Sequence, residues 1–224
     1  MKTRVAIFTH ESRVENLQQT IDALEAANMP VHTISTQTVE GSGPANRKNA
    51  ARALYQAFDG NPVLVLEDDV TAGRYVREWV EYLEARVLEV TCLLAMRPEF
   101  YSVDTEVQIR QPRNRRRDKP LSLTPTRLEP NPNLQHFWGS QAMWLPAWFA
   151  ELVLNDGRVW SDEHAPLGPW DHTIRNLLLQ ENRIMLTAFP GVFQHQSPPS
   201  VRQRKNKRLK LAAVFDPEGR PPKT

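Results

Sequence analysis

The stretch Val63–Val70 constrains the fold more than any other, because an apolar run in it ends abruptly in three acids. Its first four residues, Val63–Leu66, are all apolar, which is typical of a strand buried on both faces of a parallel sheet. Three charged carboxylates are too costly to bury unpaired. We therefore expect Glu67, Asp68 and Asp69 at or beyond the carboxyl end of this strand.

That edge is where open α/β sheets bind ligands, and clustered carboxylates suit a divalent cation. Two other interpretations remain open from this stretch alone. The acids could form a solvated loop, or they could precede a helix that starts near Thr71, because Asp and Glu are favoured at helix N-termini.

The segments around this stretch alternate between strand and helix patterns. Short apolar runs predict strands, and apolar residues at helical spacing predict helices. The order begins with a strand at 5–8, a helix at 14–28, a strand at 31–35, a helix at 45–58 and the strand from 63. It continues with a helix at 75–88, a strand at 90–95, helices at 146–154 and 169–182, and a strand at 184–189. Such an order predicts an α/β fold with a mostly parallel sheet, right-handed crossovers and flanking helices.

The charge is unevenly distributed along the chain. The net charge is +2, but segment 110–119 carries +5 and segment 202–210 carries +6, so subtracting both leaves −9 for the rest. An acidic body with two concentrated basic segments favours a polyanionic partner such as DNA, although such segments are also common as solvated tails. The candidate nucleic-acid contacts are Arg113, Arg115, Arg116, Arg117, Arg204, Lys205, Lys207 and Arg208.

Composition and length predict one soluble domain over residues 1–200, with an irregular basic loop at 97–134 and a basic, flexible tail at 201–224. No apolar run approaches the ~18 residues of a membrane span, and no signal pattern opens the chain, so a cytosolic location is expected. The single cysteine, Cys92, lies in an apolar run and is expected to be a small buried hydrophobe.

The order of motifs resembles that of glycosyltransferases with the GT-A fold, close to families 2 and 25. The resemblance runs from Val5 to about Ser200 and is weakest over 96–134. In it, Glu67, Asp68 and Asp69 are similar to the Glu-Asp-Asp motif of family 25. The exit loop of the first strand corresponds to the segment that holds the nucleotide base, and its candidate residues are Thr9, His10 and Glu11.

This resemblance implies a nucleotide-sugar donor, with a UDP-sugar favoured, and Mn²⁺ or Mg²⁺ as cofactor. A divalent ion that bridges the diphosphate to the carboxylates neutralises the charge developing on the leaving group. Asp69 is predicted to bind the metal together with Glu67. Glu67 or Asp68 is assigned to the ribose and to a metal-bound water.

Three further segments extend the resemblance. His195, near the end of the folded part, resembles the late histidine that completes the metal shell, and imidazole favours Mn²⁺; a lone histidine is otherwise often structural. Gly139 and Ser140 resemble the segment that passes under the donor sugar, with Trp138 on the acceptor side. Arg47, at the start of a helix, is predicted to contact the diphosphate, unless that helix simply exposes a basic face.

Asp171 resembles the catalytic carboxylate of inverting enzymes, which would take the proton from the acceptor hydroxyl. Trp170 stands where the family has a first acid, and we place it beside the donor. An aspartate here could also be a helix N-cap.

The resemblance, taken with the two basic segments, therefore implies a metal-dependent, inverting glycosyltransferase in the cytoplasm of a phage-infected or bacterial cell. The favoured acceptor is a hydroxymethylated base in DNA, as in modified phage genomes. A cell-surface polysaccharide or lipid-linked acceptor is the alternative within this class. A non-catalytic GT-A domain that binds nucleic acid is the alternative outside it. A nucleotidyltransferase is disfavoured, because segment 9–12 lacks the glycines of a phosphate-binding loop.

Overall fold

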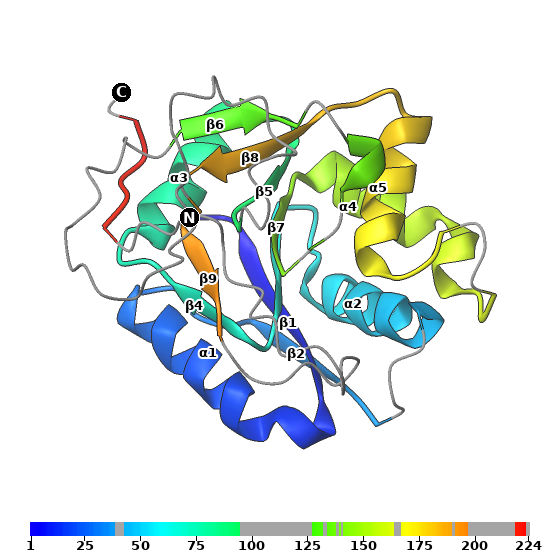
Figure 1. Ribbon diagram of the computed structural model, residues 1–224, viewed down its shortest axis with the longest axis horizontal. Helices are drawn as coiled ribbons and strands as arrows, with labels where there is room; N and C mark the ends of the chain where they lie inside the picture. The colour runs from blue at the N-terminus through cyan, green and yellow to red at the C-terminus, as the bar shows by residue number, and fades with distance from the viewer. Residues whose placement is uncertain are drawn as a thin grey trace, which may run out of the picture.

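The computed structural model describes residues 1–38, 43–94, 127–131, 134–137, 139, 141–163, 167–189, 191–196 and 218–222. A seven-stranded sheet forms its centre, in the order β2-β1-β3-β7-β5-β8-β6 (Figure 1). Its strands are β1 (Arg4–His10), β2 (Thr33–Gln37), β3 (Val63–Glu67), β5 (Val90–Cys92), β6 (Arg127–Pro130), β7 (Ala142–Leu145) and β8 (Met185–Phe189). A second sheet pairs β4 (Val70–Ala72) with β9 (Phe193–His195).

The described α-helices are α1 (Val14–Ala26), α2 (Gly43–Ala57), α3 (Val76–Arg86), α4 (Ala147–Asn155) and α5 (Trp170–Gln180), with 3₁₀ turns η1 (Glu11–Arg13), η3 (Leu134–His136) and η4 (Gly157–Trp160). The first three described α-helices each lie between strands, whereas α4 and α5 follow each other in the element order.

Five of the seven central strands run in one direction. β1 is parallel to β2 and β3, and β5 is parallel to β8, whereas β7 and β6 are antiparallel to their neighbours. The predicted mostly parallel sheet is confirmed, and this architecture is consistent with a Rossmann-like GT-A fold. β7, inserted between β3 and β5, was not predicted as a strand.

Helices cover both faces of the sheet. Residues of α2, α4 and α5 form one core cluster, and residues of α1 and α3 form the other. The side chains of β3 alternate between the two: Val63 and Val65 face the first, and Leu64 and Leu66 face the second. All four are fully buried. The prediction that this strand is buried on both faces is confirmed.

The chain does not enter a helix directly after the acids. Val70–Ala72 forms β4, which pairs antiparallel with β9, and α3 begins only at Val76. The alternative of a helix starting near Thr71 is therefore wrong. The reason is long-range: β9 arrives from the far end of the folded part and pairs with this segment.

Residues 218–222, within the predicted tail, lie against α3. The Trp79 indole donates a hydrogen bond to the Gly219 carbonyl over 3.0 Å. The Arg220 guanidinium lies over the Tyr75 ring, 4.2 Å from its centroid, and donates to the Tyr75 hydroxyl over 2.6 Å. Gly219 and Arg220 therefore contact the folded body.

Cys92 is buried at the end of β5, as predicted, and burial raises the pKa of its thiol to about 12. Among the described residues, no helix is long and apolar enough to cross a membrane.

Candidate functional site

The acids after β3 lie at the carboxyl edge of the parallel strands and are largely buried. Asp68 is 1% exposed and Asp69 is 3% exposed. Asp68 accepts hydrogen bonds from the Thr9 hydroxyl and from the backbone of His10, both in the exit loop of β1. Burial raises the pKa of Asp68, and the attraction of Arg13 and the Thr9 hydrogen bond offset this effect only in part.

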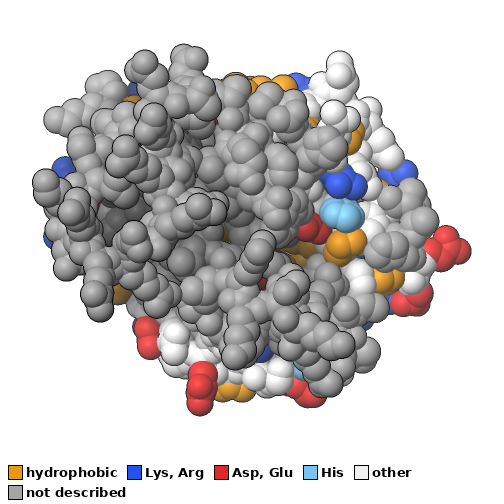
Figure 2. Space-filling view, in the orientation of Figure 1, with side chains coloured by type: hydrophobic (Ala, Val, Ile, Leu, Met, Phe, Trp, Pro, Cys, Tyr) orange, Lys and Arg blue, Asp and Glu red, His pale blue; other side chains and the backbone are white. Residues whose placement is uncertain are grey.

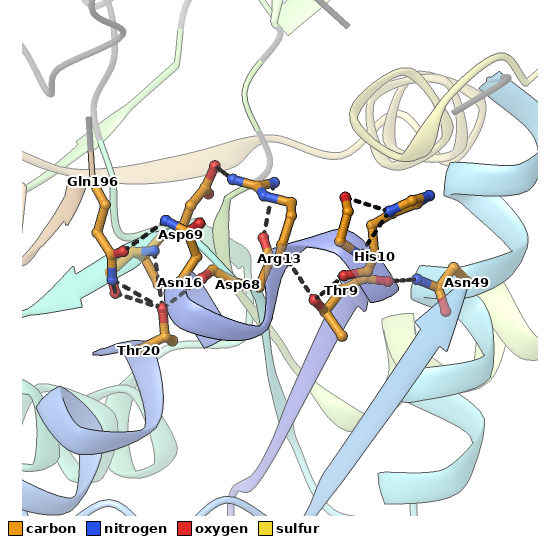
Figure 3. A network of polar contacts seen from close by, with 11 residues as sticks. Thr9, His10, Arg13, Asn16, Thr20, Asn49, Asp68, Asp69 and Gln196 are labelled. Carbon is orange, nitrogen blue, oxygen red and sulfur yellow. Dashed lines mark hydrogen bonds and ion pairs between the residues drawn. The ribbon is translucent and has the colours of Figure 1, made fainter. Parts of the chain in front are cut away.

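Arg13, at the end of η1, bridges the two aspartates (Figure 3). Its Nη1 lies 2.8 Å from Asp68 Oδ1, and its Nη2 contacts Asp69 Oδ2. Burial disfavours the charged guanidinium, but the summed attraction of Asp69 and Asp68 prevails and raises the pKa of Arg13. Arg13 therefore carries a full positive charge between the two carboxylates.

The backbone of the acidic turn is fixed by α1 and by the residue after β9. The Thr20 hydroxyl lies 2.9 Å from the carbonyls of Asp68 and Val70. The Gln196 amide donates to the Asp69 carbonyl over 2.6 Å, and its side chain donates to the Val70 carbonyl over 3.0 Å. This frame gives the two carboxylates a defined position before any ligand binds.

β9 also brings His195 to this turn. His195 pairs with Val70 across the two-stranded sheet, one residue beyond Asp69. The backbone of the predicted late histidine thus lies beside the acids. Its side chain is outside the described part of the structure, so its metal role stays a prediction.

Asp69 and Glu67 suit a divalent ion whose other ligands include phosphate oxygens of a substrate. Within the described residues, no group of three His, Cys, Asp or Glu side chains could hold a metal alone. Ions such as Mg²⁺ are commonly bound through one or two carboxylates together with substrate phosphates. Asp69, with Glu67 beside it at the end of β3, supplies hard oxygen donors of this kind.

The exit loop of β1 carries two further polar groups at the same edge. His10 Nδ1 accepts a hydrogen bond from the Ser12 amide over 3.2 Å, which leaves Nε2 as the protonated nitrogen. His10 lies opposite Gln37 of β2. Among the described residues, neither His10 Nε2 nor Gln37 Oε1 has a hydrogen-bond partner. Glu11 is exposed on η1.

Asp171 lies in the first turn of α5 and is half-buried. Its Oδ2 accepts a hydrogen bond from the Gly139 amide over 3.3 Å, which joins two of the predicted site segments. Gly139 has a φ of 107°, a conformation that favours glycine. The residue flanking α5 is Pro169, so the N-cap interpretation of Asp171 is wrong.

The structure corrects the predicted contact of Arg47 with the diphosphate. It is fully buried, and its guanidinium donates over 2.5–3.0 Å to four backbone carbonyls, those of Val159, Ser161, Glu163 and Gly168. Burial lowers the pKa of Arg47. Because its donors are used in this way, Arg47 holds the segment that leads into α5 and does not face the acids.

Neighbouring residues of α2 act on the same segment. The Asn46 side chain accepts a hydrogen bond from the Trp170 amide over 3.1 Å, at the start of α5, and Lys48 pairs with Asp162. Trp170 itself is fully buried in the core cluster with α2 and α5, so its predicted contact with the donor is also corrected. The start of α2 therefore holds the residues just before Asp171, through contacts with Gly168 and Trp170.

Several predicted site residues lie outside the described part of the structure. They are Trp138, Ser140, Arg113, Arg115, Arg116, Arg117, Arg204, Lys205, Lys207 and Arg208.

Comparisons with known proteins do not assign the chain to a family. No protein-family model and no curated protein match the sequence. The chain is similar to a solved glycosyltransferase involved in the glycosylation of the major capsid of PBCV-1, with a TM-score of 0.48 and 7% identity over 87% of this chain and 95% of that one. It is also similar to a solved protein from STIV, with a TM-score of 0.46 and 12% identity over 96% of this chain and 95% of the other. Likenesses of this size do not establish a shared activity.

Sequence reasoning missed Arg13, Thr20 and Gln196 as site residues. For Arg13 a signal was present, because it is the only basic residue in the polar segment that follows the first strand and precedes the first helical run. Thr20 and Gln196 gave no signal, since their roles depend on contacts across 48 and 126 positions of the chain.

Proposed function

We propose that this protein is a glycosyltransferase that moves a sugar from a nucleotide sugar to a hydroxyl acceptor. The observation that carries the proposal is the contact between two loops at the carboxyl edge of the sheet. There the exit loop of β1 and the acids after β3 form one charged, buried cluster, made by Thr9, Arg13, Asp68 and Asp69. The Gly139 and Asp171 pair supplies a further carboxylate from a different segment.

The donor would lie along this edge. His10 Nε2 is a donor and Gln37 Oε1 an acceptor, a pair suited to the hydrogen-bonding edge of a nucleotide base such as uracil. Asp69 and Glu67 would hold a Mn²⁺ or Mg²⁺ ion, which neutralises charge on the leaving diphosphate. Asp68 is already held by Thr9 and Arg13, so we assign it to positioning.

Asp171 would act as the general base. It takes the proton of the acceptor hydroxyl as that oxygen forms a bond to the anomeric carbon, and the bond from this carbon to the diphosphate oxygen breaks with its electron pair. Such a displacement from the opposite face inverts the anomeric configuration. The Gly139 amide fixes one oxygen of Asp171, which orients the carboxylate.

For the acceptor we favour a hydroxymethylated base in DNA. The support is the charge distribution of the sequence, in which segments of +5 and +6 stand against −9 for the remainder. Figure 2 shows acidic side chains of described residues along the lower and right-hand margins of one face, with lysine and arginine side chains at its left and right margins. Lysine and arginine side chains give sequence-independent affinity for phosphates, as such a substrate requires.

The test of the proposed function is product formation. The full chain is incubated with Mn²⁺, a panel of UDP-sugars and duplex DNA that contains hydroxymethylated bases, and the nucleosides are analysed by mass spectrometry. We expect a nucleoside heavier by one sugar. A sugar added only to a glycan or lipid-linked acceptor would identify the alternative acceptor, and binding to DNA without turnover of any donor would favour the non-catalytic domain.

Neutralising the second basic segment is expected to weaken DNA binding. The variant carries Gln at Arg204, Lys205, Lys207 and Arg208, and its affinity for duplex DNA should fall by about tenfold or more at moderate salt. The slope of log affinity against log salt should also fall, by about 0.9 for each lost phosphate contact. Substitution is preferred to deletion of 201–224, because deletion would also remove the Gly219 contact with Trp79.

The control variant removes the same number of charges from exposed positions on α2 and near α3, namely Arg52, Arg74, Arg77 and Arg86. Fluorescence anisotropy over a salt series measures both variants. Equal losses in the two would show that only net charge matters and would contradict a DNA-binding role for this segment.

A further inference from the structure

Arg13 is the more exposed partner of the two aspartates it bridges. Its side chain is 15% exposed, against 2% for Asp68 and 4% for Asp69. The guanidinium therefore reaches further toward solvent than the two carboxylates do. Its positive charge stands beside Asp69, where it would repel an approaching cation.

The two aspartates are held differently. Asp68 binds the Thr9 hydroxyl through Oδ2 and Arg13 through Oδ1, so both of its oxygens are used by the protein. Asp69 binds Arg13 through Oδ2, while its backbone carbonyl accepts from the Gln196 amide. Asp69 can thus change its side-chain partner without moving the backbone of the turn.

Charge makes such an exchange favourable. Two buried carboxylates need a positive neighbour when no ligand is bound, and Arg13 supplies it. A divalent ion together with a diphosphate would satisfy Asp69 and would also place phosphate oxygens near the guanidinium. A guanidinium binds phosphate and carboxylate through the same forked geometry.

We propose that Arg13 is an exchangeable counter-ion of Asp69. In the donor-free protein it occupies Asp69. When a divalent ion arrives with the donor, Arg13 releases Asp69, keeps Asp68 and donates its free N–H groups to the diphosphate. Arg13 contacts both acids through its guanidinium, so this movement needs only its side chain. The inference rests on the proposed function and deepens it.

The test is Mn²⁺ binding to the full chain without nucleotide, followed by the electron paramagnetic resonance signal of free Mn²⁺. If Arg13 competes with the ion, Arg13→Gln should bind Mn²⁺ about tenfold more tightly than the wild type. The matched control is Arg77→Gln, which removes one charge from α3 and leaves the acid pair untouched. In an Asp69→Asn background, Arg13→Gln should have no effect on Mn²⁺ affinity.

A second measurement keeps the proposal testable if Arg13→Gln is poorly folded. Arg13→Lys keeps the charge but loses the fork, so its Mn²⁺ affinity should lie between those of the wild type and Arg13→Gln.

Unchanged or weaker Mn²⁺ binding by Arg13→Gln would overturn the proposal, as would the absence of Mn²⁺ binding by every variant. Neither result depends on sugar transfer. Failure of the proposed function is read separately, from the lack of product with any donor.

Discussion

Replacing Arg47 with Met is expected to lower the free energy of unfolding by about 2–4 kcal/mol, since a buried carbonyl costs about 1–3 kcal/mol when unpaired. Arg47 donates to two buried carbonyls, those of Val159 and Gly168, and to two part-buried ones, those of Ser161 and Glu163. Methionine fills much of the space of the arginine stem but offers no donor. Equilibrium unfolding in urea, followed by circular dichroism, measures the loss.

The control is Arg52→Met on the same helix, where the side chain is exposed, and its effect should stay within about 0.5 kcal/mol. Arg47→Lys should fall between the two, because an ammonium cannot reproduce the fork. A loss below about 1 kcal/mol in Arg47→Met would contradict the anchoring role that its four carbonyl contacts indicate.

The second large effect is expected from Asp171→Asn, which should reduce the rate of sugar transfer by about 10²–10⁴-fold. The amide oxygen of asparagine can still accept from the Gly139 amide, so the local structure should persist. The affinity for the nucleotide sugar should be unchanged, because the proposed donor contacts lie on other segments. Transfer is measured at saturating donor, and donor affinity by isothermal titration calorimetry.

Glu181→Gln, an exposed acid at the end of the same helix, is the matched control and should retain full activity. Asp171→Asn with a rate within about threefold of the wild type would remove Asp171 as the base, given the size expected for that role.

The sequence predicted the elements that depend on local pattern. The apolar run of β3 indicated burial on both faces, and the fully buried Val63–Leu66 agrees with it. The acids were placed at the end of this strand because buried charges need partners. The structure bears out that position and shows the partner to be Arg13.

The features that the sequence did not predict depend on contacts between distant segments. A cationic helix start is a plausible phosphate site in any sequence. Arg47, however, donates its hydrogen bonds to backbone carbonyls in segment 159–168, more than 110 positions away. β7 has only four residues, and its strand character comes from pairing with β3 on one side and β5 on the other. No local pattern encodes such partners.

Contacts between distant segments also decide which of Trp170 and Asp171 is buried. Both follow Pro169 at the start of α5, and residue type alone does not say which of them faces the core. Packing against α2 buries Trp170 completely, while Asp171 turns toward Gly139.

The most direct test of a nucleotide-sugar site at the acidic edge compares the wild type with Asp69→Asn. UDP release from a panel of UDP-sugars is followed in the presence of Mn²⁺, with the exposed Glu81→Gln on α3 as the control. We expect turnover of at least one donor by the wild type and the control, and a loss of about 100-fold or more in Asp69→Asn. Wild-type rates in Asp69→Asn would contradict a donor site at these acids.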